Sequence, residues 1–120
     1  MGGFDGHHLL STTQIVTPGS SNRYGPQMRE VVVDHCSVSL EDKVMVTGGV
    51  RHNQPGSDVA EMMNIDTGDW EVLSKMKYPR ADHTCTTVWL SQDSYNDDIL
   101  NGGYVTNTSV LSVVVAGGKY

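Results

Sequence analysis

The sequence is poor in several residue types that mark particular classes of protein. It has one phenylalanine, two cysteines, and eight Lys and Arg residues against fourteen Asp and Glu, which gives a net charge of −6. This acidic balance argues against a nucleic-acid backbone or an anionic membrane surface as the main partner, because both are negatively charged. No apolar stretch approaches the roughly 18–20 residues that a membrane-spanning helix needs. We therefore expect neither a nucleic-acid nor a membrane partner.

The sequence also lacks a recognisable signal peptide and the paired cysteines of a zinc site. The first eight residues lack the basic and apolar regions of a signal peptide, so a cytoplasmic location is favoured unless this start is internal to a longer protein. Cys36 and Cys85 are far apart in the sequence and form no Cys-x-x-Cys pair, which argues against a zinc site. We expect two reduced, partly buried thiols, and a single disulfide is the alternative if the parent protein is secreted.

The sequence does contain an internal repeat. Asp34-His35 recurs 48 residues later as Asp82-His83, and Met28 recurs at the same spacing as Met76. Three diglycines complete the series: Gly2-Gly3, Gly48-Gly49 and Gly117-Gly118. The last interval is about 21 residues longer than the repeat. We expect an insertion at 91–108, a segment rich in Asp, Asn, Ser and Gly.

Each repeat unit predicts short strands and no helix. Residues 31–40 and 43–47 are apolar and β-branched, and Glu41-Asp42 forms a turn between them. Residues 59–65 and 70–73 predict a third and a fourth strand on either side of a second turn. Four short strands recurring every 45–50 residues or so are typical of a propeller blade.

The second unit resembles the kelch repeat. In that family a diglycine ends the second strand, and a tyrosine and a tryptophan follow on the third and fourth strands; here Met63 takes the place of the tyrosine. Tyr24 stands roughly at the tryptophan position of the first unit. The resemblance depends on residues of the second unit and on those just after it, and the diglycine near the end of the third unit repeats the motif. These residues are Gly48, Gly49, Trp70, Met76, Pro79, Arg80, His83, Gly117 and Gly118.

The resemblance implies an all-β fold made of kelch-type β-propeller blades. One complete four-stranded blade is expected at 31–79, the C-terminal part of a blade at 1–30, and the N-terminal part of a third blade, with the insertion, at 80–120. We expect the chain to be a segment of a longer propeller. The alternative is that several copies assemble into a ring through their open blade edges.

The resemblance also implies a role in protein–protein interaction, as a binding or scaffold module. Kelch propellers include the substrate-recognition parts of cullin-based ubiquitin ligases and actin-binding proteins. Loops on a propeller face vary without disturbing the blades and carry binding residues. The candidate binding residues are Arg51, His52, Asn53 and Gln54 in one loop, and Tyr95 and Tyr104 in or near the insertion.

The alternative function is that of a kelch-type copper radical oxidase, a galactose-oxidase-like enzyme. Such an enzyme needs a cysteine-crosslinked tyrosine with paired histidines, and the sequence shows no such constellation. His35 and His83 occupy the same repeat position, while His7-His8 and His52 have no ligand spacing. We therefore predict no catalytic residue, no metal site and no cofactor.

Overall fold

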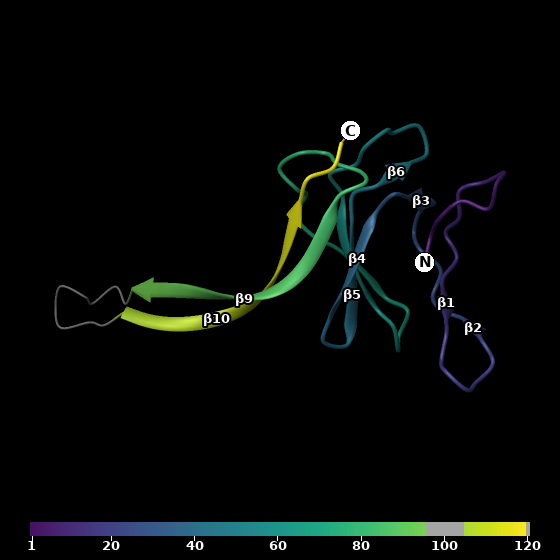
Figure 1. The fold of residues 1–120 in the computed structure, drawn as a ribbon. Helices are drawn as coiled ribbons and strands as arrows, with labels where there is room; N and C mark the ends of the chain where they lie inside the picture. Colours follow the sequence, from purple (N-terminus) through teal and green to yellow (C-terminus); the bar gives the residue numbers. More distant parts are fainter. Residues whose placement is uncertain (96–104, 120) are drawn as a thin grey trace.

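A computed structural model describes residues 1–95 and 105–119. Within these residues all regular structure is β, arranged in four antiparallel sheets (Figure 1). The strands are β1 (Gln14–Ile15), β2 (Arg23–Tyr24), β3 (Val32–Val33), β4 (Cys36–Leu40), β5 (Lys43–Thr47), β6 (Val50–Arg51), β7 (Ala60–Asn64), β8 (Trp70–Val72), β9 (Thr84–Tyr95) and β10 (Val105–Ala116). In this part of the chain, no helix is long and apolar enough to cross a membrane.

The second unit holds the largest sheet, with strand order β4-β5-β7-β8. Its two predicted turns are present, at Glu41-Asp42 and between β7 and β8. The strand predicted at 31–40 is divided in two, because Asp34 adopts a left-handed conformation with φ 56°. Asp82 does the same with φ 58°, and a short polar side chain tolerates this conformation better than an apolar one does. The Asp-His dipeptides therefore lie just before β4 and β9, and the prediction that Asp34-His35 lies inside a strand over 31–40 is wrong.

The first unit contributes a hairpin that matches the outer half of the central sheet. Gln14 pairs with Tyr24 across β1 and β2 as Glu61 pairs with Val72 across β7 and β8. Tyr24 therefore occupies the repeat position of Val72 and not that of Trp70. The placement of Tyr24 at the tryptophan position was wrong because the two turns differ in length.

The third unit contributes a hairpin that matches the inner half of the central sheet. Thr84 pairs with Ala116 as Cys36 pairs with Thr47. In place of the turn Glu41-Asp42 this hairpin has residues 89–111, of which 89–95 and 105–111 continue β9 and β10. The outer part of the hairpin projects from the rest of the molecule as an arm (Figure 1). The polar insertion therefore begins and ends as paired strand, consistent with the Thr and Val residues along it.

The apolar core lies between the first and second units. Met28, Val32 and Val46 are buried there, and Trp70 packs against them. The indole Nε1–H of Trp70 donates a hydrogen bond of 3.0 Å to the carbonyl oxygen of Gln27, in the first unit. Met63, which replaces the family's tyrosine, is fully buried. Methionine fills this site without an aromatic ring because its unbranched side chain adapts to an irregular space.

Candidate functional site

The diglycines form the contacts between successive units. A Cβ atom on Gly48 would clash with the carbonyl oxygen of Arg80 and would lie 2.6 Å from the Cε1 atom of His83, both in the third unit. A Cβ on Gly49 would lie 2.8 Å from the Cβ of His35, in its own unit. The first glycine thus contacts the histidine of the following unit, and the second contacts the histidine of its own.

The same two contacts recur at the other diglycines. A Cβ on Gly2 would lie 2.9 Å from Cε1 of His35, which belongs to the following unit. A Cβ on Gly118 would lie 2.8 Å from the Cβ of His83, in its own unit. Each repeated histidine therefore packs between a glycine of the preceding unit and a glycine of its own unit. This packing explains why the histidines recur with the diglycines.

Both repeated histidines are partly or fully buried, and each has an unpartnered ring nitrogen. His83 Nε2 lies 2.8 Å from the hydroxyl oxygen of Thr47, while the buried Nδ1 atoms of His35 and His83 have no hydrogen-bond partner within the described residues. Burial lowers the pKa of His83, and the nearby Arg80 lowers it further. Burial also lowers the pKa of His35, with a smaller contribution from Arg51 among the nearby positive charges. The neutral imidazoles are therefore the stable form at these junctions.

Arg51 does not lie on the surface, and this corrects the prediction that it belongs to an exposed binding loop. It ends β6, and its side chain is 2% exposed. Its Nη1 lies 3.1 Å from a carboxylate oxygen of Glu61, also 2% exposed, and 3.4 Å from one of Glu30. A buried guanidinium requires such charge partners. The signal in the sequence was Glu61 itself, a charged residue among the apolar residues at the start of the predicted strand 59–65.

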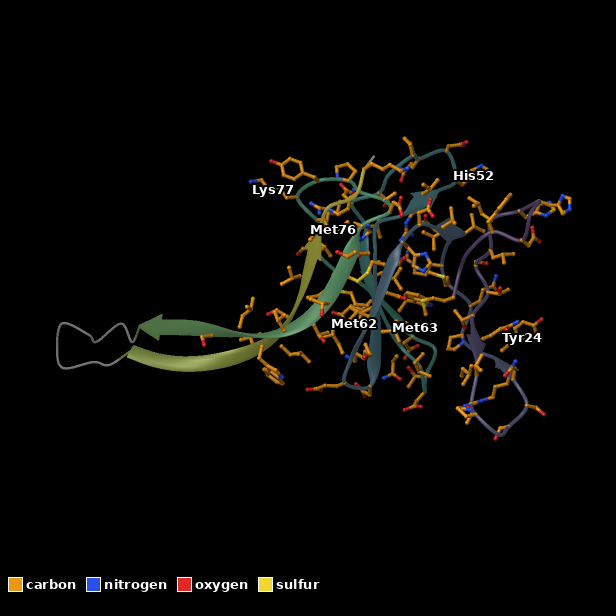
Figure 2. The ribbon with its side chains drawn as sticks, in the orientation of Figure 1. Tyr24, His52, Met62, Met63, Met76 and Lys77 are labelled. Atoms are coloured by element: carbon orange, nitrogen blue, oxygen red, sulfur yellow. A yellow bond between two sulfur atoms is a disulfide. The ribbon has the colours of Figure 1, made fainter. Side chains whose placement is uncertain are left out.

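The remaining residues of that loop form an exposed turn. Arg51 and Gln54 exchange backbone N–H···O=C bonds of 3.1 and 2.9 Å, and Asn53, between them, has φ 62°. His52, Asn53 and Gln54 are all exposed, and Figure 2 shows His52 at the outer edge of the molecule. We call residues 51–54 the Arg51 turn. The buried ion pair of Arg51 with Glu61 anchors the first residue of this turn to β7.

Of the two tyrosine candidates, one belongs to the projecting hairpin. Tyr95 is the last residue of β9, and Tyr104 lies outside the described residues. The structure does not bring Tyr95 near the Arg51 turn, because β9 runs away from the central sheet (Figure 1). Another aromatic residue of β9, Trp89, has a side chain that is 65% exposed.

Cys36 and Cys85 form a disulfide, with Cα atoms 6.0 Å apart. This corrects the expectation of two reduced thiols. The cysteines differ by one position in the repeat, and the fold sets β9 beside β4, which brings the two side chains together. Each sulfur is already bonded, so neither is available for a crosslink to tyrosine of the oxidase type. Disulfides persist in oxidising compartments, which does not fit the favoured cytoplasmic location.

A family model described as the Kelch motif matches residues 32–77. The chain contains a kelch repeat. Curated proteins compared with the chain gave no match. The predicted resemblance and the all-β kelch blade fold are confirmed.

The kelch repeat spans all four strands of the central sheet and includes the Arg51 turn, Gly48-Gly49, Trp70 and Met76. Kelch repeats are in general protein-interaction or scaffold modules and are typically not catalytic. Among the described residues, no group of three or more His, Cys, Asp or Glu side chains is arranged to hold a metal ion. The surface of the kelch repeat is therefore the candidate site.

Proposed function

We propose that this kelch repeat binds a protein partner through the Arg51 turn, with His52, Asn53 and Gln54 as the contact residues. The observation that supports this proposal most strongly is the contrast between the exposed tip of the turn and its buried base. Polar side chains are held out to solvent on a backbone that is hydrogen-bonded across the turn and fixed by a buried ion pair.

A turn held in this way loses little conformational freedom when a partner binds. Ordering flexible loops and side chains is one of the main costs of protein association, and a rigid loop avoids part of it. Binding residues are commonly found on loops that a rigid scaffold positions. The partner expected for such a polar tip is a protein surface that offers hydrogen bonds to imidazole and amide groups.

The proposal is tested with the full chain immobilised as bait, followed by affinity measurement with the purified protein that it captures. Replacing His52 and Gln54 with alanine should weaken binding by tenfold or more, the effect of a modest hot spot. Glu71→Ala, an exposed change on β8, is the matched control and should leave affinity unchanged. Equal affinity of the double variant and the wild type would reject the Arg51 turn as the site.

We further propose the recognition part of a larger adaptor, or an actin-binding scaffold, as the biological role. Co-sedimentation of the chain with actin filaments separates these two roles. A bound fraction that falls in the His52→Ala/Gln54→Ala variant supports the actin-binding role. Absence of the chain from the filament pellet, together with capture of another protein, supports the adaptor role.

A further inference from the structure

A glycosylation motif lies on β10, outside the matched kelch repeat and away from the Arg51 turn. Asn107-Thr108-Ser109 has the Asn-x-Ser pattern, with a residue other than proline in the middle, that accepts an N-linked glycan in secreted proteins. It is the one such triplet in the sequence. A triplet this short also occurs by chance, so its use depends on the compartment in which the chain folds and on its place in the fold.

The disulfide between Cys36 and Cys85 indicates an oxidising compartment. It uses both cysteines of the chain, and their Cα atoms, 6.0 Å apart, are at an ordinary separation for such a bond. β4 and β9 lie side by side, so the bond depends only on strands that the chain itself contains. Disulfides of this kind persist in secreted and extracellular proteins and are rare in the cytosol. The same secretory route is the one on which N-linked glycans are added.

Asn107 lies on the projecting arm, where its backbone pairs with that of Asp93 in β9. Residues 89–111 take the place of the turn Glu41-Asp42, so the arm extends beyond the end of the four-stranded blade. Figure 1 shows the arm leading away from the central sheet. This placement follows from the length of the hairpin and does not depend on which strands lie beside the inner part of β10. A bulky glycan therefore has room on the arm that a junction between units does not offer.

We propose that this chain folds in the secretory pathway and carries an N-linked glycan on Asn107. The glycan lies near the apolar base of the arm, where the Trp89 side chain is 65% exposed and pairs across the hairpin with Leu111. At the usual rise per residue, Leu111 is about 13 Å along β10 from Asn107. Within the described residues the arm has two strands only, and its open edges offer backbone groups to other chains. A hydrophilic glycan at Asn107 hinders such edge-to-edge pairing.

The glycan site is separate from the Arg51 turn, because the arm and β6 lie in different parts of the molecule (Figure 1). A glycan on Asn107 therefore leaves the proposed contact residues free, and neither proposal depends on the other. A glycosylated chain meets its partner in the secretory pathway or outside the cell. The modification thus favours an extracellular protein over actin filaments as the partner of the Arg51 turn.

Expression of the full chain in mammalian cells behind a cleavable secretion signal tests the glycan. Chain recovered from the medium and from the cell membranes should have a mass above 13.1 kDa and return to that mass after digestion with peptide N-glycosidase. The digestion converts a glycosylated asparagine to aspartate, so peptide mass spectrometry should find aspartate at position 107. A wild type with a mass of 13.1 kDa before digestion, in both fractions, overturns the proposal.

Variants of the triplet locate the modification. Asn107→Gln and Ser109→Ala should each abolish the mass shift, because each removes a residue that the acceptor pattern requires. Thr108→Ala is the matched control on the same strand, and it should keep the shift because the middle position accepts any residue except proline. A shift that persists in Asn107→Gln, or that is lost equally in Thr108→Ala, would contradict the assignment to Asn107.

Thiol chemistry tests the compartment separately from the glycan. The secreted chain should react with a maleimide in urea only after reduction, and then at both Cys36 and Cys85. With a reductant present, the chain should unfold at a lower urea concentration than without it, because the bond restricts the unfolded state. Free thiols in the secreted chain, or equal urea midpoints with and without reductant, would show that the fold does not need an oxidising compartment and would overturn this part of the proposal.

Discussion

The two junctions between units in this chain are built differently. The junction of the first and second units has an apolar core of Met28, Val32 and Val46, with Trp70 hydrogen-bonded across it. The junction of the second and third units has a disulfide, one histidine–threonine hydrogen bond and an open groove. The first unit contributes the outer strands β1 and β2, and the third unit contributes the inner strands β9 and β10. The buried residues of the first junction lie on β3, on β5 and after β2, whereas the second junction has the contact of Gly48 with His83.

The largest expected effect lies in the ion pair beside the first junction. Within the described residues, Glu61→Gln leaves Glu30 as the only charge partner of the buried Arg51 guanidinium. Breaking a buried pair typically costs about 3–5 kcal/mol. The free energy of unfolding, from urea titration followed by circular dichroism, measures the loss. The double variant Arg51→Met/Glu61→Leu removes both charges and should lose less than Glu61→Gln alone. A double variant less stable than the single one would contradict this account.

The second junction should depend on the disulfide. Replacing Cys36 and Cys85 with alanine should lower the free energy of unfolding by about 2–4 kcal/mol, because the bond restricts the unfolded chain. Hydrogen exchange should rise more in the β9 and β10 segment near the central sheet than in β5 and β7. A uniform rise across all four strands would mean that the bond does not act specifically at this junction.

Alanine substitutions at two diglycine positions separate the effect of the contact between Gly48 and Arg80 from the effect of backbone strain. Gly48 and Gly117 both have positive φ, 61° and 74°, so an alanine at either position is strained by a similar amount. A Cβ on Gly48 would clash with Arg80, whereas a Cβ on Gly117 would have nothing within 4 Å. Gly48→Ala should therefore lose about 2 kcal/mol more than Gly117→Ala, the middle of the range for overpacking. Equal losses would show that the contact with the third unit contributes nothing.

The smallest effect is a dependence of stability on pH through the two junction histidines. Burial lowers the pKa of His35 and of His83 below the ordinary value of 6.5. The unfolded chain then binds more protons than the folded one below pH 6.5, so the free energy of unfolding falls as the pH falls. His83→Gln, which retains a hydrogen-bonding group toward Thr47, should reduce this slope. An unchanged slope in a His35→Gln/His83→Gln variant would assign the pH dependence to other groups.

Local patterns in the sequence were sufficient for the fold class. The strand bounds predicted at 43–47 match β5, and the strand predicted at 59–65 contains β7. The recurrence of the diglycines and the 48-residue spacing of the Asp-His pairs predicted the repeat, because each short unit packs against its neighbours in the same way. These features depend on residues close together in the chain, where side-chain pattern and turn chemistry determine the local conformation.

Three features were decided only by tertiary structure. Arg51 reads as a loop residue, and only the approach of β7 places Glu61 against its guanidinium. Cys36 and Cys85 occupy different repeat positions, and only the packing of β9 beside β4 brings their Cα atoms within 6.0 Å. The polar segment after Leu90 reads as a loop, and pairing with β10 makes its first residues a strand. The sequence by itself determined the kelch repeat and its strands, whereas contacts between distant segments decided which polar residues are buried, paired or exposed.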